Sequence, residues 1–163
     1  MSAKGRPERE LLPPGGKARS AKGAPFTLAF DAVEVGDALP PLVLPPLTRT
    51  TLALYAGGSG DLNPLHVDID FAREAGLDDV IAHGMLSMAW LARMLTHWTE
   101  QRNLREFSVR FSAITRVGER ITCTGHVAAK LERNGERLVR VEVQTTNEAG
   151  EVKLTGDALI ALT

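Results

Sequence analysis

The segment that decides the fold reads GMLSMAWLARMLTHWTE and spans residues 84–100. Its apolar residues recur every three to four positions, and additional apolar residues widen this stripe over most of a helical surface. These residues are Met85, Leu86, Met88, Ala89, Trp90, Leu91, Ala92, Met94, Leu95 and Trp98. A helix that is apolar on most sides is buried rather than lying on a surface. The segment therefore predicts a long central helix that the rest of the chain must cover.

The sequence after this helix changes to a period of two. Apolar and polar residues alternate over four segments, 107–113, 121–131, 139–143 and 152–160, with glycine-containing turn sequences between them. This pattern predicts an antiparallel meander of four strands that has one wet face and one buried face. The long helix is the only predicted element large enough to cover the buried face. The predicted fold class is therefore α+β, with a curled antiparallel sheet around one central helix.

The length of 163 residues is typical of one domain with a tail. Residues 1–24 are rich in Gly, Pro, Ala, Lys and Arg without periodicity, so we expect a disordered basic tail followed by a folded domain over residues 25–163. Residues 1–23 contain six basic and two acidic residues, whereas the remainder contains 13 basic and 18 acidic residues. An acidic folded body disfavours nucleic-acid binding, which needs a clustered basic face.

Three further features of the sequence indicate the cellular compartment. No apolar run approaches the ~18 residues of a membrane span, and the first residues lack the apolar core of a secretory signal. The single cysteine, Cys123, excludes an internal disulfide. We therefore expect a cytoplasmic protein with no membrane association.

A short segment with acid–base residues precedes the predicted helix and reads YAGGSGDLNPLHVD over residues 55–68. Pro64 forbids a continuous helix here, so a bent loop can aim Asp61 and His66 at one point. A carboxylate and an imidazole that share a water form a general acid–base pair near neutral pH. The structural alternative is that Asp61 and Asn63 are turn residues and His66 is an ordinary loop histidine.

A second candidate feature lies where the chain enters the buried helix, at Ile81-Ala82-His83-Gly84-Met85. Backbone N–H groups at a helix N-terminus are free donors, and a glycine there lets a substrate carbonyl approach closely, as in an oxyanion hole. The alternative is that Gly84 only permits tight packing. For His83 a capping or core role is the better interpretation of the residues alone.

Taken together, residues 55–85 resemble the hydratase-2 signature of the MaoC-like dehydratases, a hotdog-fold family of (R)-specific enoyl-CoA hydratases. The matching pieces are Tyr55-Ala56, Ser59-Gly60-Asp61, Asn63-Pro64-Leu65-His66, Asp68, Ala72, Gly76 and Ile81-Ala82-His83-Gly84-Met85. A looser similarity extends over residues 48–163 and is greatest to the β-type subunits of two-subunit (3R)-hydroxyacyl dehydratases.

The resemblance implies that Asp61 and His66 are the catalytic dyad and that the backbone N–H of Gly84 binds the thioester oxygen. Four more residues are expected to bind substrate: Ser59, Asn63, His83 and Met85. The family often has a serine two turns along the central helix, where this chain reads Ala89-Trp90-Leu91-Ala92. That contact is therefore expected to be missing, with Trp90 near the acyl tunnel.

The function implied is that of a hydro-lyase, which hydrates trans-2-enoyl-CoA with (R) specificity or dehydrates (3R)-hydroxyacyl thioesters. The alternative is a non-catalytic acyl-CoA-binding subunit of a heteromeric dehydratase. No cofactor or metal is expected, since coenzyme A enters as part of the substrate. The expected partners are the acyl-CoA thioester and a second hotdog subunit, in a homodimer or a heterodimer with a paralogue. A metal site at His66, Asp68, Asp70 and His83 is disfavoured because no compact ligand triad of known spacing appears.

Overall fold

The computed structural model describes residues 28–163, so the predicted tail over residues 1–24 lies outside the described part of the chain. Its regular elements are β1 (Leu42–Val43), α1 (Arg49–Ser59), α2 (Ile69–Glu74), α3 (Gly84–Trp98), β2 (Leu104–Phe111), β3 (Thr122–Arg133), β4 (Glu136–Thr146) and β5 (Val152–Ala161). Short 3-10 turns occur at Phe30–Ala32, Pro64–His66 and Gln101–Asn103. None of the helices within this part of the chain is long and apolar enough to span a membrane.

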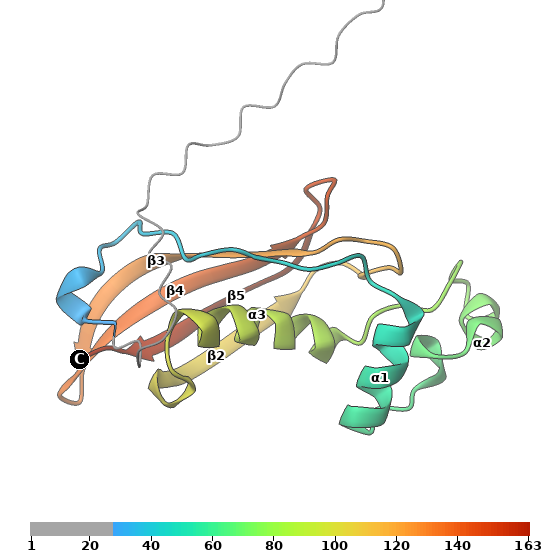
Figure 1. Ribbon diagram of the computed structural model, residues 1–163, viewed down its shortest axis with the longest axis horizontal. Coiled ribbons are helices and arrows are strands. Elements are labelled where there is room, and N and C mark those ends of the chain that lie inside the picture. The colour runs from blue at the N-terminus through green and yellow to red at the C-terminus, as the bar shows by residue number, and fades with distance from the viewer. Residues whose placement is uncertain (1–27) are drawn as a thin grey trace, which may run out of the picture.

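The five strands form one antiparallel sheet in the order β1-β3-β4-β5-β2, which curls along the side of α3 (Figure 1). The β3–β4–β5 part is the predicted meander, and the Asn134-Gly135 turn between β3 and β4 has positive φ angles of 54° and 79°, as its sequence favours. The predicted position of the first strand is wrong, because β2 pairs with β5 and not with β3. The segment from Ser112 to Ile121 carries the chain from β2 at one edge to β3 on the far side of β4 and β5, which a period-two pattern does not show.

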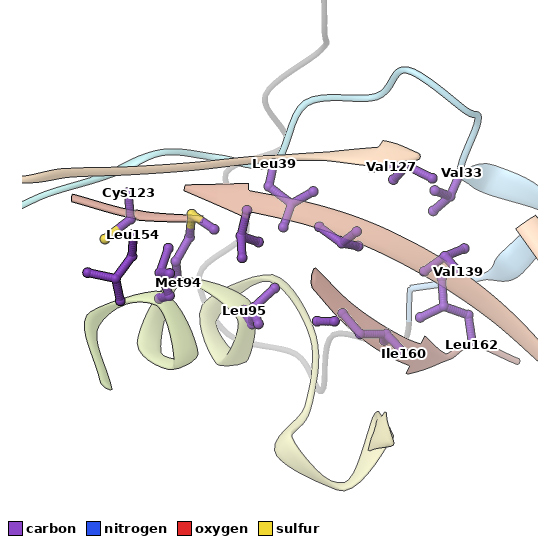
Figure 2. Packing of buried hydrophobic residues seen from close by; sticks show 14 residues of the cluster. Val33, Leu39, Met94, Leu95, Cys123, Val127, Val139, Leu154, Ile160 and Leu162 are labelled. Atoms are coloured by element: carbon purple, nitrogen blue, oxygen red, sulfur yellow. The ribbon is translucent and has the colours of Figure 1, made fainter. Parts of the chain in front are cut away.

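The long helix packs its apolar surface against the concave face of the sheet. Leu91, Met94 and Leu95 of α3 are at most 1% exposed and contact a cluster of strand residues (Figure 2). The strand residues of this cluster include Cys123, Val127, Val139, Val141, Val143, Leu154, Ala158 and Ile160. The predicted α+β fold, a curled antiparallel sheet around a central helix in the hotdog arrangement, is therefore confirmed.

A second, smaller apolar cluster holds α1 and α2 beside the N-terminal end of α3 (Figure 1). Its buried members are Leu47, Leu52, Ala72, Val80, Ala82 and Leu86. Trp90 packs against both clusters and so ties this group of helices to the main core. This arrangement positions the loop between α1 and α2 next to the first turn of α3.

Candidate active site

The loop after α1 is shaped by its own side chains. Gly60 ends α1 in the left-handed conformation with φ 77°, and Asp61 then accepts a hydrogen bond at Oδ1 from the Asn63 N–H at 3.2 Å. Asn63 in turn accepts at Oδ1 from the Leu65 N–H at 3.0 Å. Pro64 begins the 3-10 turn Pro64–His66, where its missing N–H removes no hydrogen bond. The bend predicted from Pro64 is therefore present, and it directs His66 toward the entry to α3.

The tautomer of His66 follows from its hydrogen bond. Its Nδ1 lies 2.8 Å from the carbonyl oxygen of Ile81. A carbonyl oxygen only accepts, so Nδ1 carries the proton in the neutral ring and Nε2 presents a lone pair. In this tautomer a neutral imidazole can accept a proton at Nε2, as a general base does.

His83 lies directly behind this histidine. The two imidazole rings have centroids 3.8 Å apart with 30° between their planes, and the ring of Tyr55 lies 4.8 Å from that of His83. Nε2 of His83 donates to the backbone carbonyl oxygen of Asp61 at 3.1 Å. His83 is 1% exposed and its Nδ1 has no hydrogen-bond partner among the described residues. His83 therefore has a structural role, because it packs against His66 and holds the backbone of the loop at Asp61.

Asp61, His66 and His83 converge although they come from two separate segments. Each offers one nitrogen or oxygen atom, and these atoms all lie within 4.8 Å of one another. The Asp61 carboxylate is exposed, His66 is half-buried and His83 is buried. A water between the carboxylate and the imidazole of His66 would contact both groups, which is the arrangement that general acid–base catalysis needs.

A pocket of about 380 Å³ opens beside His66 and Gly84. Its walls come from the start of α3, from the end of β2 and the segment after it, and from β5. A side chain on Gly84 would place its Cβ 3.0 Å from Cε1 of Phe111, so a larger residue here would displace this half-exposed ring from the helix entrance. The backbone N–H of Gly84, the first residue of α3, has no intrahelical partner.

The other residues predicted to bind substrate lie outside the lining of this pocket. Ser59 accepts at Oγ from the Asp61 N–H at 3.2 Å, and Asn63 uses its side-chain oxygen on the loop backbone. Met85 is 56% exposed. Like Asp61, the residues Ser59, Asn63, His83 and Met85 are not among those that line the pocket. The substrate-binding roles assigned to them stay predictions.

Sequence reasoning overlooked residues deeper in the pocket. Ser87, one turn after Gly84, and Thr115, between β2 and β3, both line it and are buried. The spacing of three residues between Gly84 and Ser87 places both on one face of the helix, so Ser87 could have been predicted from the sequence. No sequence pattern indicates Thr115. Trp90 is not a lining residue, because it packs between the two apolar clusters.

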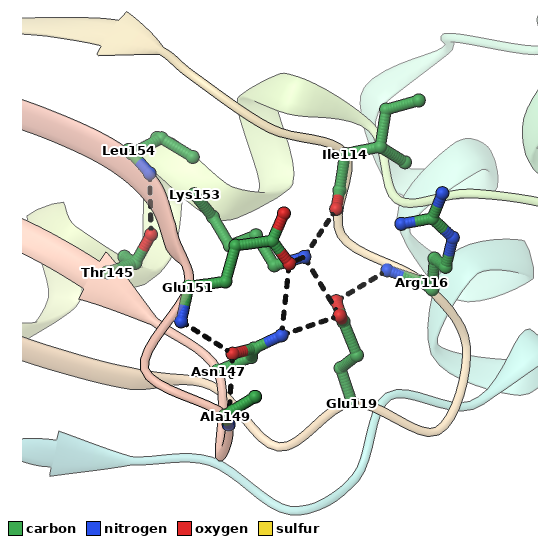
Figure 3. A network of polar contacts seen from close by, with 9 residues as sticks. All are labelled: Ile114, Arg116, Glu119, Thr145, Asn147, Ala149, Glu151, Lys153 and Leu154. Carbon is green, nitrogen blue, oxygen red and sulfur yellow. Dashed lines mark hydrogen bonds and ion pairs between the residues drawn. The ribbon is translucent and has the colours of Figure 1, made fainter.

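A buried ionic network holds the wall that carries Thr115 (Figure 3). Lys153 of β5 is 0% exposed, and its Nζ donates to the carbonyl oxygen of Ile114 at 2.7 Å. The same Nζ contacts Glu119 Oε1 at 2.8 Å and Glu151 Oε2 at 2.6 Å. The segment that carries Thr115 is also bonded to the residues just before α3, since the Ala82 N–H donates to the carbonyl oxygen of Thr115 at 2.9 Å.

Another hollow lies elsewhere on the described surface. It has a volume of about 470 Å³ and covers the polar face of β3, β4 and β5, with His126, Arg140 and Glu142 in its lining. None of the predicted site residues lines it. His66 and Gly84 line the smaller pocket, so we place the candidate active site there. Asp61 lies near His66 but outside the lining of this pocket.

Comparisons with known proteins show the family of the chain. A family model described as "MaoC like domain" matches residues 34–149. The (R)-specific enoyl-CoA hydratase of Rhodospirillum rubrum is 29% identical over 122 residues, covering 70% of this chain and 78% of that protein. The fatty acid synthase subunit beta of Saccharomyces cerevisiae is 34% identical over 132 residues, covering 78% of this chain. The chain spans only 6% of the length of that subunit.

Solved structures of hydratases are similar to this chain in fold. The R-hydratase PhaJ1 from Pseudomonas aeruginosa, in its unliganded form, has a TM-score of 0.73 at 27% sequence identity. The alignment covers 83% of this chain and 86% of that one. The sequence signature, the curled sheet around α3 and the family match over most of the described residues lead to one conclusion: this chain belongs to the MaoC-like dehydratase family.

Proposed function

We propose that this chain is a hydro-lyase that adds water to trans-2-enoyl-CoA with (R) specificity and catalyses the reverse dehydration of (3R)-hydroxyacyl thioesters. The observation that carries the proposal is the convergence of the Asp61 carboxylate and the His66 imidazole beside the N-terminus of α3. Similarity to an (R)-specific enoyl-CoA hydratase and to an R-hydratase supports the same reaction.

The proposed mechanism assigns one role to each polar group. The thioester oxygen accepts a hydrogen bond from the backbone N–H of Gly84, which stabilises the enolate that forms when C3 is attacked. Such a preorganised donor contributes about 10²–10³ in rate. Asp61 and His66 hold the water, remove its proton as its oxygen bonds to C3, and deliver a proton to C2, a contribution of about 10²–10⁴. Both parts of the water molecule are thereby added to the substrate, the hydroxyl group to C3 and a hydrogen to C2.

No cofactor is needed in this mechanism, because the thioester carbonyl accepts the developing charge. Coenzyme A arrives with the substrate. The pocket has no lysine or arginine in its lining, so the coenzyme A phosphates must lie outside its mouth. We propose a cytoplasmic enzyme that acts without nucleic acid or membrane.

We also propose that the active form is a dimer, either of two copies or with a paralogous hotdog subunit. Within the described residues β2 pairs only with β5, so its other edge presents free backbone N–H and C=O groups. Two such edges can pair antiparallel across a two-fold axis.

The test is loss of the ultraviolet absorbance of the enoyl thioester when crotonyl-CoA is hydrated. Asp61→Asn and His66→Gln should each lower turnover by at least about 10²-fold. Asp70→Asn and His97→Gln make the same chemical changes at exposed positions of α2 and α3 and should leave turnover unchanged. Normal turnover in either dyad variant would refute the dyad. Binding of crotonyl-CoA without hydration by the wild type would favour a non-catalytic acyl-CoA-binding subunit.

A further inference from the structure

Two hydroxyl-bearing residues that line the pocket are not used by the proposed chemistry. Ser87 is 2% exposed and Thr115 is 4% exposed, and both side chains line the pocket. Neither hydroxyl hydrogen-bonds to another of residues 28–163, unlike Thr145 in the nearby sheet, whose Oγ1 accepts from the Leu154 N–H at 3.1 Å. Among the described residues, His83 Nδ1 is the only fully buried side-chain nitrogen or oxygen without a partner, so both hydroxyl oxygens are accessible from the pocket. Their hydrogen-bond partner is therefore whatever occupies the pocket, either water or a polar group of the substrate.

The surroundings of the two hydroxyls exclude a simple alkyl chain as the best occupant. Apart from His66 and the exposed Ser112, the remaining lining side chains are apolar and include Ala82, Phe111 and Leu154. An alkyl chain that filled this space would displace water from both hydroxyls and leave them without hydrogen-bond partners. A site with such groups rejects a ligand that lacks the matching polar atom.

The charge of the lining limits the polar group further. His66 is the only titratable residue that lines the pocket, and no cationic side chain does. A carboxylate on the acyl chain would therefore enter without a counter-ion, which is strongly unfavourable in a desolvated site. A neutral hydroxyl or carbonyl fits, since a serine or threonine hydroxyl both donates and accepts.

The position of Ser87 indicates where that group lies on the substrate. Ser87 is three residues after Gly84 in α3, about 4.5 Å along the helix axis at 1.5 Å per residue. If the thioester oxygen is bound at Gly84, the polar group lies only a few bonds beyond the reacting double bond.

We propose that Ser87 and Thr115 are specificity-determining residues that select acyl chains with a neutral hydroxyl or carbonyl group close to the double bond. This inference rests on the proposed function and names its substrate class. Ser87 and Thr115 play no part in the acid–base steps.

The test compares hex-2-enoyl-CoA with its 5-hydroxy derivative, which differ by one hydroxyl at equal chain length. The wild-type chain should hydrate the hydroxylated substrate with a kcat/KM about tenfold higher or more. Ser87→Ala and Thr115→Val each remove one hydroxyl with little change of volume and should reduce this preference several-fold. Thr96→Val, at the outer part of α3, is the matched control and should keep it.

The outcomes separate this inference from the proposed function. Equal losses on both substrates in Ser87→Ala would mean that the hydroxyl acts on the thioester itself, which would overturn the specificity role. An unchanged preference in both variants would overturn it as well. If the wild type hydrates neither substrate, the proposed function fails. The inference is then decided by calorimetric binding of hexanoyl-CoA and 5-hydroxyhexanoyl-CoA, where the hydroxylated ligand should bind more tightly and lose that advantage in both variants.

Discussion

Replacement of Lys153 by methionine tests how strongly the pocket wall is held. The Lys153 ammonium is fully buried and has three oxygen partners, on Ile114, Glu119 and Glu151. Methionine retains the apolar stem but removes all three hydrogen bonds. The Glu119 side chain, 18% exposed, is then left without its cationic partner, whereas that of Glu151 is 50% exposed and can be solvated.

The expected cost follows from these exposures. Breaking a buried ion pair on one side costs about 3–5 kcal/mol, and the lower end applies because one of the two carboxylates reaches water. A loss of about 3 kcal/mol lowers the melting temperature of a domain of this size by about 10 °C. Thermal unfolding followed by circular dichroism at neutral pH measures this directly, with Glu151→Gln as a control that should shift the melting temperature much less.

The pH dependence gives an independent check. Burial raises the pKa of Glu119, but hydrogen bonds from Lys153, the Arg116 N–H and Asn147 lower it more, so the net pKa lies below its usual value. A carboxyl whose folded pKa is depressed stabilises the fold above its unfolded pKa and loses that contribution as the pH falls through the folded value. The difference between wild type and Lys153→Met should therefore shrink below about pH 4.3, the ordinary glutamate value. A variant as stable as the wild type at neutral pH would refute the reasoning.

Three other outcomes are expected. Gly156→Ala should destabilise strongly or prevent folding, because the new Cβ would lie 2.1 Å from the backbone oxygen of Ser108; urea unfolding of any soluble variant measures the loss. Asp68→Ala should cost about 1 kcal/mol in the same assay, since Asp68 caps α2 by accepting from two backbone N–H groups. Cys123 should resist iodoacetamide in the folded protein at pH 8 and react only on unfolding, because burial raises its pKa to about 12; rapid native labelling, seen by mass spectrometry, would contradict this.

The parts of the fold that the sequence predicted are those with strong periodicity or specific turn residues. The apolar stripe of α3, the Asn134-Gly135 hairpin and the bend at Pro64 are local features, and each is present. The neighbour of β2 was predicted wrongly, because alternation reports which face is buried and not which strand is adjacent.

In the candidate site, too, the contacts between distant segments could not be predicted from the sequence. The meeting of His66 with His83 depends on a hydrogen bond to the carbonyl oxygen of Ile81, and a backbone acceptor has no sequence signature. Thr115 enters the pocket because the segment after β2 crosses the sheet and is held by Lys153 through Ile114. Such contacts between distant segments arise only when the chain is folded.

The central claim is that Asp61 and His66 act on one water as a unit, and a double-variant cycle tests it most directly. The measurement is kcat/KM for crotonyl-CoA hydration by the wild type, Asp61→Asn, His66→Gln and the double variant. Residues that act as a unit are strongly non-additive, so the double variant should be no more than a few-fold slower than the slower single variant. Losses that multiply in the double variant would show that the two residues act independently, and the shared-water mechanism would then be wrong.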